Sequence, residues 1–401
     1  MKYLVTMPAL AAAMLFLHCL QIPRAAADSY PVDTVIADTV LRTHVDSRHA
    51  HELLQQPQLS ANSGKFNGYL AADDCQPGSE LPGVEVFRRL TQDFSTDTAT
   101  ALLIRCLYQM PQVYRAQALF REAAEARRKL DAVQAEYMRS RAQRYTVLFV
   151  PGWGYRSNGE VTGGNLRKPR EIIGALGYET HLVALNDFGS VEDNAKIIAN
   201  TLREHLGKGK QVLLASASSG GPSVAMALNE ADIFSHPALA GWINICGVLR
   251  GSPIIDHFTP WPKSLVIHVV NLFEGWTRDE LNSLSRSRSA PRFRQYRAPR
   301  QLTVLNYVGV PFSGQVSDMG RTLYRLLRKQ GPNDGLTLIP DAIAPGYTIM
   351  AIGTDHFIRE DPEIDLKTAA LLSVLIRLIE SSVPGLPGNQ AQASAPPSGS
   401  G

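Results

Sequence analysis

The sequence predicts an α/β protein whose mainly parallel sheet is covered by helices on both faces. From residue 145 onward, short apolar runs of strand type alternate with longer runs of helical periodicity, which is typical of strand–helix–strand crossovers. The strand-like runs are apolar along most of their length, as expected for strands that are buried on both faces. A third observation is the stretch of small residues at 215–221, where a strand turns sharply into a helix.

The predicted elements of this domain follow one another in a regular order. The first strand is rich in β-branched and aromatic residues and ends at Pro151-Gly-Trp-Gly154. Ser190 is placed to cap the second helix, and Pro222 can help to start the third. The predicted strands are 145–150, 179–185, 211–214, 242–246, 301–308 and 347–352. The predicted helices are 166–176, 190–206, one that begins near residue 220, 317–328 and 366–381.

Three segments flank or interrupt this alternation. Residues 28–144 lack strong strand signals, and from 97 to 144 Ala and Leu recur at helical spacing, so we expect a helical N-terminal extension packed on the main domain, 145–382. Residues 251–300 break the alternation with irregular aromatic and apolar residues, which indicates a lid-like insertion. Residues 383–401 are rich in Pro, Gly, Ser and Ala, and we expect a disordered tail.

The first 27 residues have the features of a cleavable signal peptide. Lys2 precedes an apolar run, and Ala25-Ala26-Ala27 offers small residues for cleavage. An uncleaved membrane anchor is the alternative, but Pro8 and His18 interrupt the short apolar run. We therefore expect a periplasmic or secreted protein.

Charge and cysteine content narrow the classes of partner. The chain has 40 Lys and Arg residues and 37 Asp and Glu residues. This nearly balanced charge favours no particular partner, and we expect no binding to nucleic acid. Cys75 and Cys106 could pair in an oxidising compartment, whereas Cys246 lies in an apolar run and is expected to be a buried strand residue. The cysteine spacing fits no zinc motif, and we expect neither a metal nor another cofactor.

The strongest chemical signal is the strand-to-helix turn around Ser218. Ser216 and Gly220 flank Ser218 at two residues on either side, in a variant of the G-x-S-x-G turn that exposes a nucleophilic serine. Ser219 has small neighbours at the same spacing and is the rival, but Ser218 is favoured because two glycines follow at the place where the helix packs closest. A purely structural serine-rich turn is the alternative to both.

A serine nucleophile needs a base and an acid that orients the base. In this architecture they are expected in the chain order Ser, Asp or Glu, His, and the sequence supplies Asp334 in Gly-Pro-Asn-Asp-Gly and His356 in Gly-Thr-Asp-His-Phe. Each has a simpler interpretation, Asp334 as a turn residue and His356 as a loop histidine. Other candidates for the acid are Asp256, Asp318 and Asp341, whereas Asp355 adjoins the histidine and should point away from it.

Backbone amides are expected to stabilise the oxyanion. One donor would be the N–H of Ser219, directly after the nucleophile, and the other the N–H of Trp153 in the glycine-containing loop after the first strand. The alternative is that Pro-Gly-Trp-Gly is only a tight turn.

Together, Pro151-Gly-Trp-Gly154, Ser216-Ala-Ser-Ser-Gly-Gly221, Pro332-Asn-Asp-Gly-Leu336 and Asp355-His-Phe357 resemble the α/β-hydrolase superfamily, especially its lipase and esterase branch. The resemblance covers about residues 145–382. It implies an eight-strand type of sheet, a Ser–Asp–His triad and hydrolysis of a carboxylic ester or thioester through an acyl-enzyme. Two positions depart from the family pattern: Ser216 stands where glycine is usual, and Pro151-Gly-Trp replaces a common His-Gly pair.

We therefore expect an exported serine hydrolase that acts on a hydrophobic or lipidic ester. An acyltransferase or thioesterase with the same triad, or a non-catalytic binding protein on this scaffold, are the alternatives. A run of six arginines between residues 286 and 300 could contact an anionic membrane surface, although such runs are more often solvated faces.

Overall fold

The computed structural model describes residues 29–56, 66, 68–70, 75, 80–259, 276–358 and 361–382. The predicted signal peptide, the predicted disordered tail and residues 260–275 of the insertion lie outside these residues. Among the helices that are described, none combines the length and the apolar character that a membrane crossing requires.

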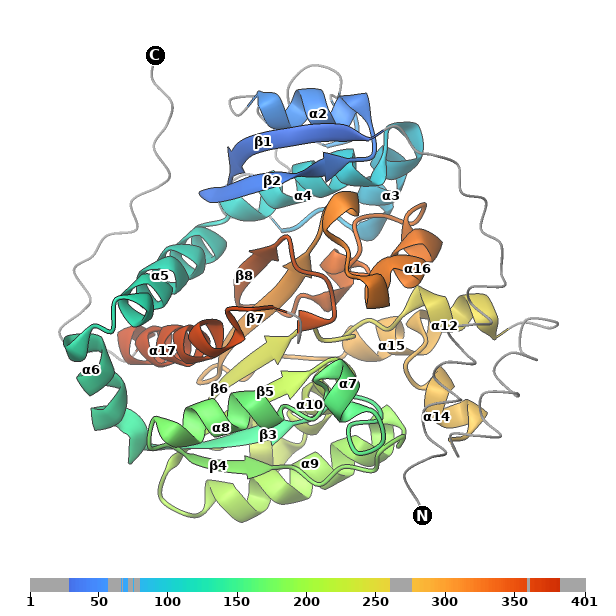
Figure 1. Cartoon of the computed structure of the whole chain (residues 1–401). Helices are drawn as coiled ribbons and strands as arrows, with labels where there is room; N and C mark the ends of the chain where they lie inside the picture. The colour runs from blue at the N-terminus through green and yellow to red at the C-terminus, as the bar shows by residue number, and fades with distance from the viewer. Residues whose placement is uncertain are drawn as a thin grey trace, which may run out of the picture.

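A six-stranded, fully parallel sheet forms the centre of the molecule (Figure 1). The spatial order is β4-β3-β5-β6-β7-β8, so the chain leaves β3 in one direction and then continues from β5 in the other. Such a reversal leaves a crevice at the carboxyl ends of the two strands where the direction changes, here β3 and β5. The strands are β3 (Tyr145–Val150), β4 (Glu179–Leu182), β5 (Gln211–Ala217), β6 (Leu239–Ile245), β7 (Thr303–Val310) and β8 (Tyr347–Ile352).

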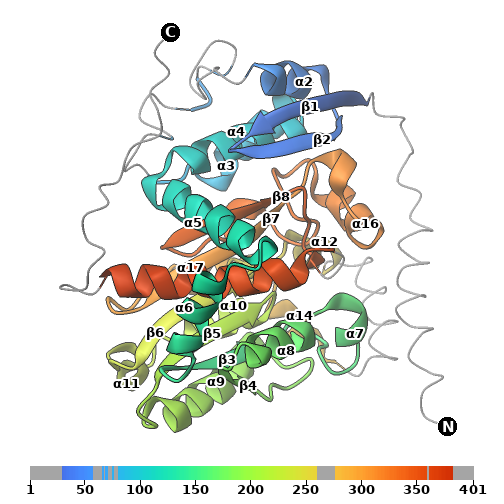
Figure 2. The ribbon, with the colours of Figure 1, turned by 60° about the vertical axis from the view of Figure 1, so that its left-hand side comes forward.

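Helices cover both faces of this sheet, which confirms the predicted fold class (Figure 2). Helices α8 (Arg167–Ala175) and α17 (Ile364–Ser382) pack on one face. Helices α9 (Val191–Leu206) and α10 (Gly220–Ala227) pack on the other. The remaining helices of this part are α7 (Gly159–Thr162), α11 (Ala231–Phe234), α12 (Pro253–Phe258), α14 (Arg278–Asn282), α15 (Arg286–Phe293) and α16 (Asp318–Leu327), with 3-10 turns at Ser313–Gln315 and Ile339–Ala342.

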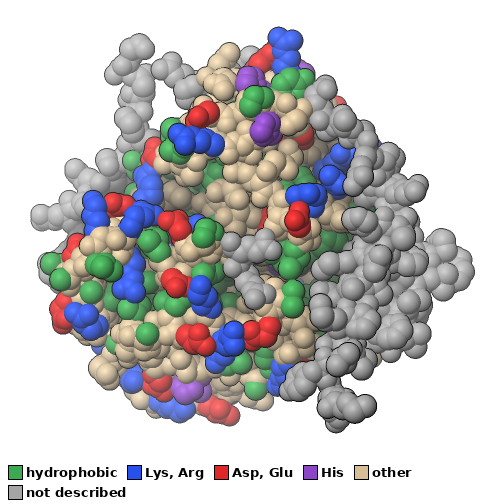
Figure 3. Space-filling model, in the orientation of Figure 1, with side chains coloured by type: hydrophobic (Ala, Val, Ile, Leu, Met, Phe, Trp, Pro, Cys, Tyr) green, Lys and Arg blue, Asp and Glu red, His purple; other side chains and the backbone are tan. Residues whose placement is uncertain are grey.

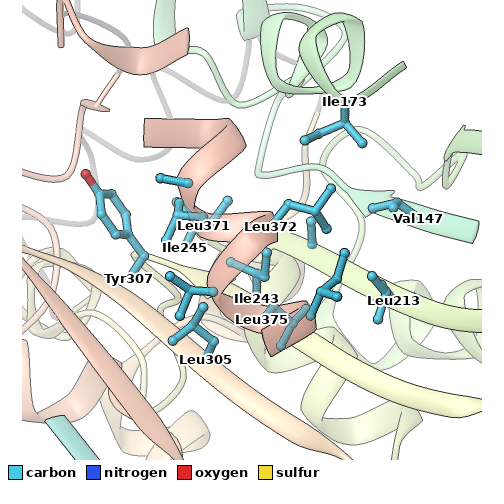
Figure 4. Close-up of a cluster of buried hydrophobic side chains, with 14 of the residues drawn as sticks. Val147, Ile173, Leu213, Ile243, Ile245, Leu305, Tyr307, Leu371, Leu372 and Leu375 are labelled. Carbon is cyan, nitrogen blue, oxygen red and sulfur yellow. The ribbon is translucent and has the colours of Figure 1, made fainter. Parts of the chain in front are cut away.

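The face beneath α8 and α17 contains a large apolar core (Figure 4). Ile173 of α8 and Leu372 of α17 pack against the sheet residues Val147, Ile243 and Leu305. Because side chains on both faces are buried, the strands carry apolar residues at successive positions instead of alternating ones.

The N-terminal region begins with an antiparallel hairpin that the sequence did not reveal, and helices follow it, as expected for residues 28–144. Strands β1 (Tyr30–Ile36) and β2 (Thr39–Val45) pair through a turn at Ala37 and Asp38, which both have positive φ. Turns of this kind are usually signalled by Asn-Gly or Asp-Gly, and Ala-Asp carries no such signal. The helices that follow are α2 (Arg48–Gln55), α3 (Val84–Asp93), α4 (Thr96–Gln109), α5 (Pro111–Arg128) and α6 (Ala132–Ala142). A disulfide joins Cys75 to Cys106 of α4.

This N-terminal region covers the β8 edge of the sheet. Gln117 of α5 accepts a hydrogen bond from the N–H of Met350 at 3.0 Å and donates one to the carbonyl of Met350 at 3.4 Å. The side chain thus pairs with backbone groups of β8 that an edge strand would leave open. The N-terminal region also shares an apolar core with Val308, Phe312 and Ile339 of the main domain. Among the described residues, the sheet therefore ends at β8, which helices of the N-terminal region cover.

A close pair of carboxyl groups, the buried Asp97 and the half-buried Asp46, lies where the N-terminal region meets the loop after β7. Asp97 accepts hydrogen bonds from the N–H groups of Asp46 and Ser313, at 2.8 and 2.9 Å, and from the Ser313 hydroxyl. Burial, and then the neighbouring Asp46, raise the pKa of Asp97 to about 7. Burial also raises the pKa of Asp46. The pair consequently retains a proton well above the ordinary pKa of a carboxyl group.

We expect the free energy of unfolding to fall as the pH rises from about 4 to about 7. Over this range the unfolded chain releases a proton that the folded chain still holds on Asp97, so rising pH favours unfolding. Asp46→Asn removes one of the two facing charges and should weaken this dependence and raise stability at pH 8. Urea unfolding at pH 5 and pH 8 measures the effect. Asp33→Asn, in the exposed Asp33–Arg42 pair of the hairpin, is the control, and an Asp46→Asn protein with the wild-type dependence would refute the assignment.

Candidate active site

Ser218 lies on a sharp turn between β5 and α10. Its φ angle is +50°, a conformation that non-glycine residues rarely adopt and that is typical of a strand-to-helix nucleophile turn. The N–H of Ser218 donates to the carbonyl of Ile245 at 3.0 Å, and its own carbonyl accepts from the N–H of Val248 at 3.1 Å. The end of β6 thus holds the turn in place.

The small residues around the turn are required by close backbone contacts. A Cβ atom on Gly220 would lie 2.7 Å from the carbonyl oxygen of Pro151, and one on Gly221 would lie 3.1 Å from the Cα of Gly247. A side chain at either position would push α10 away from the neighbouring loops. The two glycines after Ser218 therefore have the close-packing role that the sequence predicted.

Ser216, which stands where the family pattern has glycine, has a structural role of its own. It is completely buried in β5, and its Oγ accepts a hydrogen bond from the indole N–H of Trp242 in β6 at 2.8 Å. A buried indole N–H without a partner would be costly. Serine at this position thus supplies the hydrogen-bond acceptor for the buried indole of Trp242, and it does not prevent the turn.

The structure brings Ser218, His356 and Asp334 together in one hydrogen-bonded chain. The Ser218 Oγ lies 3.0 Å from His356 Nε2, and His356 Nδ1 lies 2.8 Å from Asp334 Oδ2. His356 follows β8 and Asp334 follows α16, so elements far apart in the sequence meet at the carboxyl edge of the sheet. The imidazole and the carboxylate are buried, whereas the serine is half-buried. This order of hydroxyl, imidazole and carboxylate is the arrangement that activates a serine nucleophile.

The loop of Asp334 fixes the direction of its carboxylate. Oδ1 accepts hydrogen bonds from the N–H groups of Leu336 and Thr337 at 2.9 and 2.8 Å, which leaves Oδ2 directed at His356. The carbonyl of Asp334 also accepts from the N–H of His356 at 2.8 Å. Backbone and side chain together set the position of the imidazole relative to the carboxylate.

Among the residues that the structure describes, neither of the two amides predicted for the oxyanion hole, the N–H groups of Trp153 and Ser219, has a hydrogen-bond acceptor. Gly152 lies directly against the nucleophile, because a Cβ on it would be 3.3 Å from the Cβ of Ser218. Its N–H donates to the carbonyl of Gly164 at 2.9 Å, which anchors the loop beside the serine.

Asp187 holds the same loop from the other side, a role that the sequence did not reveal. Its carboxylate accepts from the N–H groups of Arg156 and Ser157, and its carbonyl accepts from the N–H of Gly154 at 2.8 Å. The ring of the next residue, Phe188, packs against Trp153 with centroids 5.5 Å apart. The segment after β4 thus shapes the predicted oxyanion loop, a long-range contact that no local pattern signals.

The other aspartates considered for the acid of the triad make different interactions. Asp341 forms an ion pair with Arg286 at 2.7 Å, and Asp256 accepts from backbone N–H groups at the start of α15. Asp318 is exposed beside Arg321. Asp355 points away from His356, with its carboxylate bonded to the N–H groups of Ser317 and Phe357 at 2.8 and 2.9 Å.

Cys246 is a buried free thiol next to the carboxylate and the imidazole. Its sulfur and ligand atoms of Asp334 and His356 lie within 4.8 Å of one another, the one cluster with metal-ligand spacing among the described residues. Burial raises the pKa of the Cys246 thiol well above its ordinary value, so the group stays neutral. Asp334 and His356 are hydrogen-bonded to each other, so two of the three members of this cluster belong to the chain of hydrogen bonds from Ser218 to Asp334.

The arginine run is partly neutralised within the protein. Arg286, Arg288 and Arg292 form ion pairs with Asp341, Asp279 and Glu192, respectively. On the face drawn in Figure 3, basic and acidic side chains are interspersed. The free basic charge of residues 286–300 is thus smaller than its composition suggests.

Comparison with solved structures finds chains with low sequence identity. A metagenomic carboxyl esterase is 21% identical over 60% of this chain and 76% of that chain, with a TM-score of 0.48. A Bacillus licheniformis lipase in its mature form is 20% identical over 58% of this chain and 91% of its own, with a TM-score of 0.44. A Legionella pneumophila phospholipase in complex with thio-NAD is 15% identical over 59% and 58% of the two chains, with a TM-score of 0.41. No protein-family model and no curated protein sequence matches this chain.

The topology of the chain itself is that of an α/β-hydrolase fold. Its sheet is parallel, and a serine turn after β5 is followed by an acid after β7 and α16 and by a histidine after β8, which is the order of these residues expected for this fold.

We expect Ser216→Ala to lower the free energy of unfolding by about 1–3 kcal/mol, because it leaves the buried indole N–H of Trp242 without an acceptor. The turn itself should persist, since alanine is also small. Urea unfolding, together with the labelling rate of Ser218 by a fluorophosphonate, separates stability from site geometry.

The matched control for this variant is Ser223→Ala. Ser223 is equally buried, but its hydroxyl makes only a 3.4 Å contact with the Ser219 carbonyl. Equal stability losses in the two variants would argue against a specific role for the Ser216–Trp242 hydrogen bond.

Proposed function

We propose that this protein is a serine hydrolase that cleaves a carboxylic ester through an acyl-enzyme on Ser218. The observation that carries the proposal is the chain of hydrogen bonds from Ser218 through His356 to Asp334, at 3.0 and 2.8 Å. A serine hydroxyl is a weak nucleophile until a neighbouring base removes its proton. Here the base is within reach of the hydroxyl, and the acid holds the base in the required orientation.

In the acylation step, His356 Nε2 takes the proton of Ser218 as Oγ forms a bond to the ester carbonyl carbon. The negative charge on the carbonyl oxygen is stabilised by the N–H groups of Trp153 and Ser219. The bond from the carbonyl carbon to the alcohol oxygen then breaks, and the alcohol leaves with the proton from His356. Asp334 stabilises the imidazolium while it carries this proton.

In the deacylation step, water takes the place of the alcohol. His356 removes a proton from water as its oxygen attacks the acyl carbon, the bond to Ser218 Oγ breaks, and the proton returns to Oγ. The products are the carboxylic acid and free enzyme. No cofactor takes part in this scheme.

An acyltransferase or a thioesterase would use the same groups, because only the acceptor or the leaving group differs. The apolar character of the insertion 251–300 supports a hydrophobic or lipidic ester. A binding protein on this scaffold would not need the triad geometry. The proposal includes contact between an anionic membrane surface and those arginines of 286–300 that form no ion pair among the described residues.

We also propose that the protein is exported to the periplasm or secreted. The Cys75–Cys106 disulfide supports an oxidising compartment, and residues 1–27 have the composition of a signal peptide. The N-terminal sequence of the protein recovered from the periplasm or medium of a bacterial host tests the idea. A mature chain that begins at Asp28 is expected, and a cytoplasmic chain that retains Met1 or Lys2 would contradict it.

A fluorophosphonate probe should label the folded protein at Ser218, since this serine has the activating base. Mass spectrometry of the labelled peptide distinguishes Ser218 from Ser219. Labelling should be lost in Ser218→Ala and retained in Ser223→Ala. Absence of labelling in the folded wild type would favour a non-catalytic binding protein.

Asp334→Asn should lower kcat for a p-nitrophenyl ester by about a thousandfold or more, because the amide no longer selects the imidazole tautomer that accepts the serine proton. Circular dichroism checks that the variant is folded. Asp318→Asn, at an exposed aspartate, should retain wild-type kcat. A loss of less than about tenfold in Asp334→Asn would remove Asp334 from the proposed triad.

A further inference from the structure

The free thiol of Cys246 directly follows the carboxyl end of β6, next to the strand that carries the nucleophile. In the spatial order of the sheet, β6 lies between β5, which leads into the serine turn, and β7. The N–H of Cys246 donates to the carbonyl of Tyr307 in β7 at 2.8 Å, and the preceding residue, Ile245, accepts the N–H of Ser218. Neighbouring strands therefore fix the backbone of the thiol beside the serine turn.

Three possible metal ligands of different chemical type lie together at this place. The sulfur of Cys246, an imidazole nitrogen of His356 and a carboxylate oxygen of Asp334 are all within 4.8 Å of one another. Zinc binds these three kinds of ligand at about 2.0–2.3 Å, which puts the ligand atoms about 3–4 Å apart around one ion. Small movements of the three side chains would thus bring them all into contact with a single ion.

The three side chains are buried, and the chemistry of their ligand atoms favours zinc over hard ions. The exposed fractions are 2% for Cys246 and Asp334 and 9% for His356. Backbone N–H groups bind Oδ1 of Asp334, so Oδ2 faces Nδ1 of His356. Sulfur and imidazole ligands suit Zn²⁺, whereas Mg²⁺ and Ca²⁺ prefer oxygen ligands alone.

We propose that Cys246, Asp334 and His356 form an inhibitory site for Zn²⁺ and related soft divalent ions. The ion takes the place of the hydrogen between Nδ1 of His356 and Oδ2 of Asp334. The thiol releases its proton to solvent when the ion binds, and the sulfur becomes a thiolate ligand. The inhibition rests on the proposed ester hydrolysis, whereas the binding of the ion does not.

An ion at this place stops catalysis through the imidazole. In the active form Nδ1 carries the hydrogen, and Nε2, 3.0 Å from the Oγ of Ser218, has the lone pair that accepts the serine proton. A metal bond to Nδ1 uses the lone pair of that nitrogen, so the hydrogen of the neutral imidazole moves to Nε2. Nε2 then cannot take the serine proton. The carboxylate of Asp334 is also bound to the ion and no longer stabilises an imidazolium.

Binding is measured without catalysis from the ultraviolet charge-transfer absorption between thiolate sulfur and Cd²⁺, a softer relative of Zn²⁺. The folded full chain should gain this absorption on titration with Cd²⁺, and the difference from Cys246→Ala isolates the part due to Cys246 from any due to Cys19. His356→Gln keeps the thiol but removes one ligand, and should weaken Cd²⁺ binding by about a hundredfold or more. Ser223→Ala, a buried serine of α10 outside the cluster, is the control and should bind Cd²⁺ like the wild type.

Inhibition is measured with p-nitrophenyl butyrate after incubation with Zn²⁺ to equilibrium. Saturating Zn²⁺ should lower kcat of the wild type by about a hundredfold or more, because a general base contributes at least that much, and a chelator should restore it. Mg²⁺ at the same concentration should have no effect. Cys246→Ala, compared with its own activity without zinc, should need about a hundredfold more Zn²⁺ for the same fractional loss.

The outcomes distinguish this site from the proposed hydrolysis. Equal Cd²⁺ absorption in the wild type and Cys246→Ala, or Cd²⁺ affinity that His356→Gln leaves unchanged, would overturn the metal site. Equal zinc sensitivity of the wild type and Cys246→Ala would overturn the inhibition, because the ion would then act elsewhere. A folded wild type that binds Cd²⁺ through Cys246 but hydrolyses no ester would overturn the proposed function and leave the metal site standing.

The test also covers a cysteine variant that fails to fold. Cys246→Ser replaces the thiol with a poor zinc ligand of similar size and should lose the Cd²⁺ absorption as Cys246→Ala does. His356→Gln keeps Cys246 itself, so its Cd²⁺ affinity decides between a site of several ligands and a single reactive thiol. Circular dichroism checks the fold of each variant.

Discussion

The backbone conformation of Ser218 is the constraint on which the rest of the site depends. A non-glycine residue at φ +50° is strained, at a cost of order 1–3 kcal/mol, and persists only where its surroundings leave no alternative. Hydrogen bonds to Ile245 and Val248 fix the turn from the β6 side, and Gly220 allows α10 to approach the loop after β3. The parallel sheet thus holds the Ser218 hydroxyl at its carboxyl edge. The loop of His356 brings the imidazole within hydrogen-bond distance of this hydroxyl, and the loop of Asp334 brings the carboxylate to the imidazole.

Much of the main domain could be predicted because its signals are local. The apolar runs after residue 145 correspond to strands, and the small residues around Ser218 are needed at a turn that any chain of this fold must make. The chain order of Ser218, Asp334 and His356 is set by the topology of the sheet, which explains how three weak motifs could indicate one place. Strand β5 extends to Ala217, three residues beyond the predicted end, because small residues there still pair with β6.

What the sequence did not reveal depends on contacts between distant segments. The hairpin 30–45 turns at Ala-Asp, which lacks the usual glycine. The bond between Ser216 and Trp242 crosses neighbouring strands, and Asp187 acts on a loop thirty residues earlier. Gln117 pairs with the edge of a strand more than two hundred residues away. Periodicity and local motifs report which face of an element is buried, but not which partner will cover it.

The position of α17 in the sequence affects when, during synthesis, the candidate site can form. This helix packs over β6 and β7 and against α5, and His356 lies only a few residues before it. During synthesis from the amino end, the base and the layer that covers this face of the core therefore emerge from the ribosome after Ser218 and Asp334. A nascent chain that stops short of them has the nucleophile and the acid but neither the base nor this covering helix.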